Sequence, residues 1–230
     1  MLYIVPTPIG NLDDMTYRGV QVLRTCDVIL AEDTRTSKKL LQHYQIDKPL
    51  WAFHAFNEHK ALKGILDNLH QGKTLALISD AGTPGISDPG FLLVRACIAE
   101  NIKVSCLPGA TAFVPALVAS GMTSDKFYFE GFLPHKKGRQ TRLKYLAQLS
   151  CTIILYESPY RLLKCLEEIR EYLGNERNVC VAREISKVYE EFLVLDVSTA
   201  IQHYTNHPPK GEIVIVIEGT ANTSSNPDKE

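Results

Sequence analysis

Three loops rich in proline and glycine carry the residues best suited to hold a small-molecule ligand. They are Val5–Asn11, Ser79–Gly90 and Pro108–Thr111. Each follows a short apolar run that predicts a parallel strand, so all three should meet at the carboxyl edge of one sheet, where open α/β sheets bind ligands. Glycine lets the backbone approach a ligand, and proline stiffens a loop before binding. One such loop would indicate a tight turn, but three on one edge favour a binding site.

Several common ligand motifs are missing from the chain. Gly82, Gly85 and Gly90 do not have the spacing of a dinucleotide-binding GxGxxG motif, and the run Gly72–Thr74 lacks the glycine that a P-loop needs five residues earlier. There is no Gly-x-Ser-x-Gly elbow and no HExxH, and the seven histidines have no metal-ligand spacing with cysteines or carboxylates. We therefore expect neither a common dinucleotide or nucleoside triphosphate site nor a metal site.

The elements that position the three loops alternate between strands and helices, which predicts a mostly parallel sheet in an α/β fold. The predicted strands are Leu2–Val5, Val28–Ala31, Pro49–Phe53, Thr74–Ser79 and Ile102–Leu107. The predicted helices are Tyr17–Thr25, Thr36–Tyr44, Glu58–Gln71 and Pro89–Glu100, the last with Asp88 as N-cap and Pro89 as its first residue.

A second series of elements predicts a second α/β domain. Its strands are expected at Phe127–Phe132, Cys151–Tyr156, Asn178–Arg183, Phe192–Asp196 and Glu212–Glu218. Its helices are expected at Arg139–Leu149 and at Pro159–Leu173, the latter with Ser158 as N-cap. We place the first domain at residues 1–118 and the second at 119–219, and expect the polar tail 220–230 to be disordered.

Composition sets wide bounds on function. The 230 residues carry a formal net charge of −1, so overall charge favours no particular partner, and a nucleic-acid site would need a local patch. The six cysteines form no CxxC pair and are expected to be reduced thiols. The first ten residues lack a basic segment, and no stretch approaches 18 apolar residues, so we expect a cytoplasmic protein without a membrane partner.

Five motifs together resemble the tetrapyrrole-methylase family of S-adenosylmethionine-dependent methyltransferases. They are VPTPIGNLDDMTYRG, VILAEDTRTS, LISDAGTPGISDPG, LPGATAFVPAL and YESPYR, in this order between residues 2 and 218. Within the family they are most similar to the branch that methylates a cytidine 2′-hydroxyl of 16S ribosomal RNA in the small subunit. This branch would make 16S rRNA the partner and S-adenosylmethionine the methyl donor, with no metal.

The resemblance implies two α/β domains, the first with a mainly parallel and the second with a mixed sheet, a cofactor in the cleft between them, and a homodimer. On this resemblance the cofactor-binding residues are Pro8, Ala81, Gly82, Thr83, Ile86, Thr111, Ala112 and Glu157. Thr83 stands where many relatives have an aspartate, which leaves open whether its side chain contacts the cofactor. The alternative for Thr83 and Thr111 is an ordinary turn or cap, and for Glu157 a solvated strand end.

A sugar hydroxyl is a poor nucleophile, so a general base would assist methyl transfer. Glu32 and Asp33 follow the strand Val28–Ala31 and are the candidates to take the proton or orient the ribose, and Arg35 beside them could bind phosphate. A structural ion-pair cluster explains the same residues equally well. His54, Asn57 and Glu58, after the next strand, are second-line candidates.

A basic segment supplies the candidate RNA contacts. Lys136, Lys137, Arg139, Arg142 and Lys144 occur in a stretch from Gly131 to Tyr156 that contains no acidic residue. Such a patch can neutralise phosphates whatever the net charge, although a solvated helix face is the alternative. Two other functions remain open: methylation of a small molecule such as a tetrapyrrole carbon, and RNA binding without catalysis.

Overall fold

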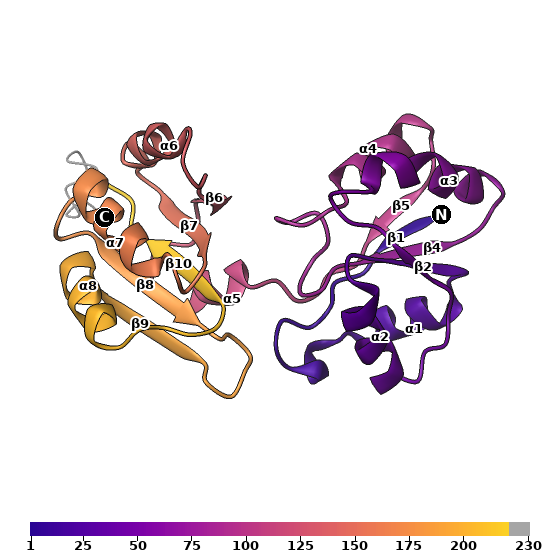
Figure 1. The fold of residues 1–230 in the computed structure, drawn as a ribbon, viewed down its shortest axis with the longest axis horizontal. Helices are drawn as coiled ribbons and strands as arrows, with labels where there is room; N and C mark the ends of the chain where they lie inside the picture. Colours follow the sequence, from indigo (N-terminus) through magenta and orange to yellow (C-terminus); the bar gives the residue numbers. More distant parts are fainter. Residues whose placement is uncertain (221–230) are drawn as a thin grey trace, which may run out of the picture. The chain divides into compact units, whose positions relative to one another are not determined.

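A computed structural model describes residues 1–220, and its backbone divides into two units (Figure 1). Unit 1 comprises Met1–Thr111, and unit 2 begins at Ala112. The division therefore falls before the boundary that we expected after residue 118. The predicted disordered tail falls on residues that, apart from Thr220, lie outside the described part of the chain.

Unit 1 is built on a five-stranded, all-parallel sheet in the order β3-β2-β4-β1-β5. Its strands are β1 (Leu2–Ile4), β2 (Val28–Ala31), β3 (Leu50–Ala52), β4 (Leu75–Ile78) and β5 (Val104–Cys106). Nearly every residue of β1, β2 and β4 is buried, which is the pattern of strands covered on both faces. The predicted parallel sheet is confirmed.

Helices cover both faces of this sheet. They are α1 (Tyr17–Thr25), α2 (Thr34–His43), α3 (Glu58–His70) and α4 (Phe91–Ala99), with a short 3-10 helix η1 (Leu12–Asp14) before α1. Leu23 of α1 and Leu41 of α2 pack in one apolar cluster on one face, while residues of α3 and α4 pack in another on the opposite face (Figure 1). The two clusters fix the sheet from both sides and leave its strand ends to the loops.

Unit 2 contains a five-stranded mixed sheet in the order β6-β7-β10-β8-β9. Its strands are β6 (Phe127–Phe132), β7 (Thr152–Glu157), β8 (Asn178–Arg183), β9 (Glu191–Asp196) and β10 (Ile213–Ile217). Only β6 and β7 run parallel, and the other three pairs are antiparallel. The predicted mixed sheet is confirmed. Because β6 and β7 are parallel neighbours, the turns that follow them leave the sheet at the same edge.

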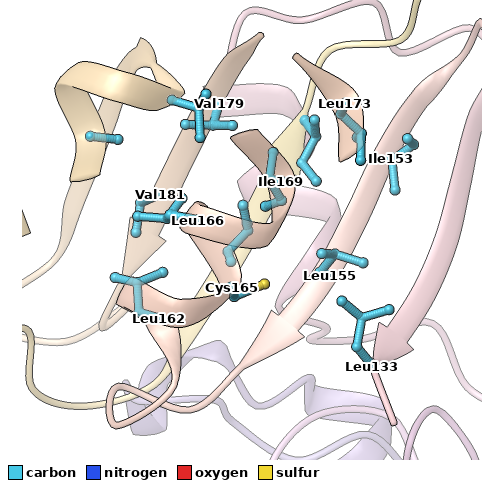
Figure 2. Packing of buried hydrophobic residues seen from close by; sticks show 14 of the residues in the cluster. Leu133, Ile153, Leu155, Leu162, Cys165, Leu166, Ile169, Leu173, Val179 and Val181 are labelled. Atoms are coloured by element: carbon cyan, nitrogen blue, oxygen red, sulfur yellow. The ribbon is translucent and has the colours of Figure 1, made fainter. Parts of the chain in front are cut away.

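The helices of unit 2 are α5 (Phe113–Ala119), α6 (Arg139–Leu146), α7 (Leu162–Leu173) and α8 (Val197–Asn206). The core lies where α7 packs on the sheet: Leu162, Leu166 and Ile169 face the strands that carry Ile153, Leu155, Val179 and Val181 (Figure 2). Contacts join α6 to α7 and α7 to α8, and α5 packs on β10. This layer holds the end of β7 and the start of α7 in one rigid body.

Some local predictions were wrong. Helix α4 begins at Phe91 with Gly90 as N-cap, so neither Asp88 nor Pro89 starts it. Helix α7 begins at Leu162, because residues Ser158–Arg161 form a turn closed by a hydrogen bond from the Arg161 amide to the Ser158 carbonyl of 2.9 Å. Pro159 stands at the second position of that turn, which suits proline, and Pro89 lies in a bend before α4.

Two helices were not predicted. In α5, Pro115 stands in the first turn, where the amide that proline lacks would have had no partner within the helix. In α8 the signal was present: Asp196 caps the helix by accepting a hydrogen bond from the Thr199 amide of 2.9 Å, and the buried Val197, Ala200 and Tyr204 have helical spacing.

Candidate functional site

Main-chain hydrogen bonds join the loops that follow β1 and β4. The Thr7 amide donates to the Gly82 carbonyl and the Gly82 amide donates to the Thr7 carbonyl, both at 2.9 Å. The buried Thr7 hydroxyl donates to the carbonyl of Ser79 at 3.0 Å, and the Ser79 hydroxyl donates to the carbonyl of Gly82 at 3.1 Å. The two loops therefore form one structure, held by main-chain hydrogen bonds and by the hydroxyls of Thr7 and Ser79.

The loop after β5 packs against the same structure. A Cβ atom added to Gly109 would lie 2.6 Å from Cβ of Pro6, so only glycine fits at this contact. The hydroxyl of Thr83 donates to the carbonyl of Ala110 at 2.9 Å. The three proline- and glycine-rich loops are thus brought together as predicted. The hydroxyl proton of Thr83 is used within the protein. The Thr83 side chain is therefore not free to donate a hydrogen bond to a cofactor.

The joined loops have features that fit a bound ligand. Gly82 is buried and has a φ of 82°, and an added Cβ there would contact Ile9 at 3.5 Å and the Ala110 carbonyl at 3.8 Å, so this glycine lies where the three loops meet. The neighbouring Ala81 is exposed, and Ile86 is partly exposed. The hydroxyl of Thr111 is buried and has no hydrogen-bond partner among the described residues. A buried polar group without a partner leaves a hydrogen bond for a ligand to make.

The remaining cofactor candidates differ in position. Pro8 is buried in the loop after β1, where it stiffens the chain beside the Thr7–Gly82 contact. Ala112 is the first residue of unit 2 and follows Thr111 directly. Whether Pro8 and Ala112 touch a cofactor stays a prediction.

The end of β2 carries an ion pair between Asp33 and Arg35. Asp33 is the N-cap of α2 and accepts a hydrogen bond from the Arg35 amide of 2.8 Å. It also pairs with the Arg35 guanidinium at 2.7 Å, and these hydrogen bonds lower the pKa of Asp33 to about 2. A carboxylate held so firmly ionised is a weak base. Of the two predicted catalytic carboxylates, Asp33 is therefore the less suited. The side chain of Arg35 is 88% exposed, and its guanidinium is paired with Asp33.

Glu32 lies in a different environment, together with two carboxyl groups from the loop after β4. Partial burial raises the pKa of Glu32, and the nearby charge of Asp80 raises it further. Burial raises the pKa of Asp88 to about 7, with Glu32 and Asp80 adding to the shift. A carboxyl group that titrates near neutral pH suits proton transfer. Within residues 1–220, no group of three or more histidine, cysteine or acidic side chains is placed to hold a metal ion.

Sequence reasoning missed Asp80 and Asp88 as members of this group. Asp88 was interpreted as a helix cap, and its high pKa depends on burial that only the folded loop shows. A usable signal existed, because Ser79–Gly90 is a ligand-type loop with two acidic residues at the edge where Glu32 also lies. His54, a second-line candidate, has a buried Nδ1 atom without a partner among the described residues.

In unit 2, Glu157 is the centre of a buried ion-pair network at the end of β7. Its side chain is 1% exposed, and one carboxylate oxygen accepts hydrogen bonds of 2.7 Å from the Ser158 amide and from Arg161. Its other oxygen lies 3.7 Å from the guanidinium of Arg139, which is itself 6% exposed and pairs with Glu168 at 2.6 Å. Glu157 is therefore not a solvated strand end, and its predicted contact with the cofactor stays untested.

The basic segment divides into paired and unpaired residues. Arg139 is buried in the Glu157 network, and Arg142 pairs with Glu130 and donates to the hydroxyl of Tyr128 at 2.7 Å. The inference that this segment lacks counter-charges is wrong for these two arginines, because the acidic partners come from neighbouring elements. Lys136 and Lys137 are exposed, and neither has an ion pair within the described part of the chain.

Comparison with known proteins settles the family. Residues 1–201 match the description "Tetrapyrrole (Corrin/Porphyrin) Methylases". The chain belongs to the tetrapyrrole methylase family. This confirms the predicted family and the predicted class of enzyme, a methyltransferase. No helix among residues 1–220 of this family member is long and apolar enough to cross a membrane.

Two curated relatives of this tetrapyrrole methylase share one name. A protein of Synechocystis sp. named "Ribosomal RNA small subunit methyltransferase I" is 52% identical over 220 residues, which cover 95% of this chain and 79% of the relative. A protein of the same name from Thermotoga maritima is 48% identical over 218 residues, which cover 95% of this chain and 98% of that relative.

Solved structures confirm the fold. The methyltransferase CobJ matches with a TM-score of 0.70 at 18% identity, over 98% of this chain and 97% of that one. The cobalt precorrin-4 methyltransferase CbiF matches with a TM-score of 0.67 at 21% identity, over 94% of this chain and 93% of that one. A uroporphyrin-III C-methyl transferase of Thermus thermophilus, complexed with S-adenyl homocysteine, has a TM-score of 0.66 at 15% identity, over 94% of this chain and 96% of that one.

Proposed function

We propose that this chain transfers the methyl group of S-adenosylmethionine to the ribose 2′-hydroxyl of a cytidine in 16S rRNA of the small ribosomal subunit. The observation that carries the proposal is the 52% identity, over 95% of the chain, to a protein named ribosomal RNA small subunit methyltransferase I. Motifs throughout the chain resemble the branch that modifies a cytidine 2′-hydroxyl, and their order supports the finer assignment.

The joined loops of unit 1 are the proposed cofactor site. The exposed Ala81 and the main chain of the loop around Gly82 would receive S-adenosylmethionine, and the unpartnered Thr111 hydroxyl would gain a partner. The cofactor supplies an activated methyl group on a sulfonium. The protein then needs to hold the ribose oxygen in line with that methyl group, and such positioning accounts for much of the rate in displacement reactions.

Glu32 is the proposed base for the ribose proton. It is partly buried, its pKa is raised by burial and by Asp80, and it stands at the strand edge that carries the cofactor loops. A base whose pKa is nearer neutral accepts a proton more readily from a weakly acidic hydroxyl. Asp33 would instead hold the start of α2, and Arg35 would offer its exposed guanidinium to a phosphate of the substrate.

The test is to incubate the purified chain with small ribosomal subunits and methyl-labelled S-adenosylmethionine, then to map the label. We expect one labelled cytidine whose ribose resists alkaline cleavage on its 3′ side. Label on a base, or in no RNA at all, would contradict the proposal. Parallel reactions with naked 16S rRNA and with a tetrapyrrole substrate separate the preferred substrate from the small-molecule alternative.

Two further features belong to the same proposal. We propose a homodimer, on the strength of the family resemblance, and analytical ultracentrifugation of the full chain would test it. We also propose a cytoplasmic location, because that is where the proposed rRNA substrate is found, and fractionation with an antibody to the chain would test it.

A further inference from the structure

A turn directly after β7 exposes an aromatic side chain. Pro159 and Tyr160 are the central residues of the turn Ser158–Arg161, which the Arg161 amide closes at 2.9 Å from the Ser158 carbonyl. Proline presets the backbone angle at the second position of such a turn. Tyr160 follows at the corner and is 97% exposed. A tyrosine held in water by a stiff turn loses little conformational freedom when something stacks on it.

A second turn, after β6, exposes two cations. The Arg139 amide donates to the Lys136 carbonyl at 3.2 Å, and Gly138 has a φ of 86°, a value that favours glycine. Lys136 and Lys137 stand at this turn and are exposed. The two side chains therefore carry free charge at a fixed place.

The Glu157 network ties the two turns together. Arg161, the last residue of the tyrosine turn, pairs with Glu157 at 2.7 Å, and its guanidinium also lies 2.7 Å from Nδ1 of His135. Arg139, the last residue of the lysine turn, donates to the carbonyl of Pro134 at 3.2 Å and lies 3.7 Å from Glu157. Since β6 and β7 are parallel neighbours, both turns leave the same edge of the sheet.

We infer that Lys136, Lys137 and Tyr160 form one binding surface for single-stranded RNA, the two-turn surface, and that Glu157 positions it. Proteins that bind single strands combine cations that follow the phosphates with an aromatic ring on which a base stacks. Both parts are present here on two rigid turns. The inference rests on the proposed function for its choice of RNA, and it assigns to Tyr160 and Glu157 roles that the basic segment alone did not suggest.

The experiment measures the affinity of the full chain for a fluorescein-labelled single-stranded RNA of about 16 nucleotides by anisotropy, at several salt concentrations. Tyr160→Ala should weaken binding about tenfold at every salt concentration, because stacking does not depend on released counterions. Tyr160→Phe should bind as the wild type does, because the ring remains. Tyr189→Ala removes a tyrosine of unit 2 that is 72% exposed and should have no effect.

The lysines should give a different signature. Replacing Lys136 and Lys137 together by alanine should reduce the slope of log affinity against log salt by about 1.4, which is about 0.7 for each lost phosphate contact. Glu157→Gln should weaken RNA binding although it removes no exposed group, because the turns lose their common partner. Unchanged affinity in Tyr160→Ala, or an equal loss in Tyr189→Ala, would overturn the inference.

The outcome of this experiment is independent of the test of the proposed function. It requires no methyl transfer, so loss of affinity in Tyr160→Ala would support the two-turn surface even if the wild type labelled no cytidine. Conversely, correct labelling of 16S rRNA with unchanged affinity in all variants would leave the proposed function standing and remove the two-turn surface.

Discussion

The loops of unit 1 that follow β1, β4 and β5 are joined by main-chain hydrogen bonds and a glycine–proline contact, whereas the turns of unit 2 that follow β6 and β7 are joined by buried ion pairs. The first arrangement, at Thr7, Gly82 and Gly109, contains no charged side chain and leaves no room for an added Cβ atom at Gly109. The second, around Glu157 and Arg139, tolerates small changes of shape but not the loss of a charge. Different kinds of substitution should therefore disrupt the two regions.

The largest effect is expected at Glu157. Glu157→Ala leaves the guanidinium of Arg139 buried with one fewer partner, and breaking a buried pair in this way costs about 3–5 kcal/mol. Urea unfolding followed through a probe in unit 2 measures the change. As a control, Glu191→Ala breaks the more exposed pair with Arg183 and should cost less than about 1 kcal/mol. Equal costs would remove the distinction between buried and exposed pairs in unit 2.

Gly82→Val tests the main-chain arrangement. The branched side chain would press on Ile9 and on the Ala110 carbonyl, where the three loops meet, so calorimetric titration should show S-adenosylmethionine binding weakened at least about 100-fold, about 2.7 kcal/mol. Gly72→Val is the matched control, because Gly72 has a similar φ of 85° with nothing within 4 Å of an added Cβ. It carries the same backbone cost of about 1–2 kcal/mol but should bind the cofactor normally. Normal binding by Gly82→Val would show that the loops hold no cofactor there.

Asp88 tests the effect of a buried charge in unit 1. Burial, with Glu32 and Asp80 nearby, raises its pKa from 3.8 to about 7, so the folded protein holds this proton more tightly than the unfolded chain. Ionised Asp88 therefore destabilises the fold above pH 7, and this penalty fades as the pH falls toward 4. Asp88→Asn should raise the urea midpoint at pH 8 and change it much less at pH 4.5. A gain that is the same at both pH values would contradict the raised pKa.

The smallest effect is expected at Thr83. Thr83→Ala removes one hydrogen bond to the carbonyl of Ala110 and should cost about 1 kcal/mol of stability. Affinity for S-adenosylmethionine should change little, because the hydroxyl proton is used within the protein. Thr83→Ser keeps the hydroxyl and should restore most of the stability. A large loss of cofactor affinity in Thr83→Ala would mean that this side chain contacts the ligand after all.

The sequence was sufficient for features that depend on local pattern. The apolar runs at Val28–Ala31 and Asn178–Arg183 predicted strands with the bounds that the structure has. The placement of the three loops followed from the rule that parallel strands carry ligands at their carboxyl ends. Where one residue type serves several local structures, as proline does before α4 and α7, the sequence could not decide between a bend, a turn and a helix start.

Features that depend on long-range pairing were out of reach. Arg139 and Glu168 are 29 residues apart in the chain, and Arg142 and Glu130 are 12 apart. The absence of acidic residues within the basic segment therefore said nothing about partners on β6 and α7. The raised pKa of Asp88 likewise needs a folded loop that excludes water. Such properties arise from tertiary burial, which residue spacing alone does not specify.

The strand order of unit 1 has a consequence for synthesis of the chain on the ribosome. β1, the first strand to be made, lies between β4 and β5, and β1 and β2 meet only through β4. Until residue 78 has left the exit tunnel, the emerging chain can pair only β2 with β3. β1 therefore has no strand to pair with until more than half of unit 1 has been synthesised. During synthesis, the sheet of unit 1 should therefore form in one late step, after β4 has emerged, and should not grow gradually from the N-terminus.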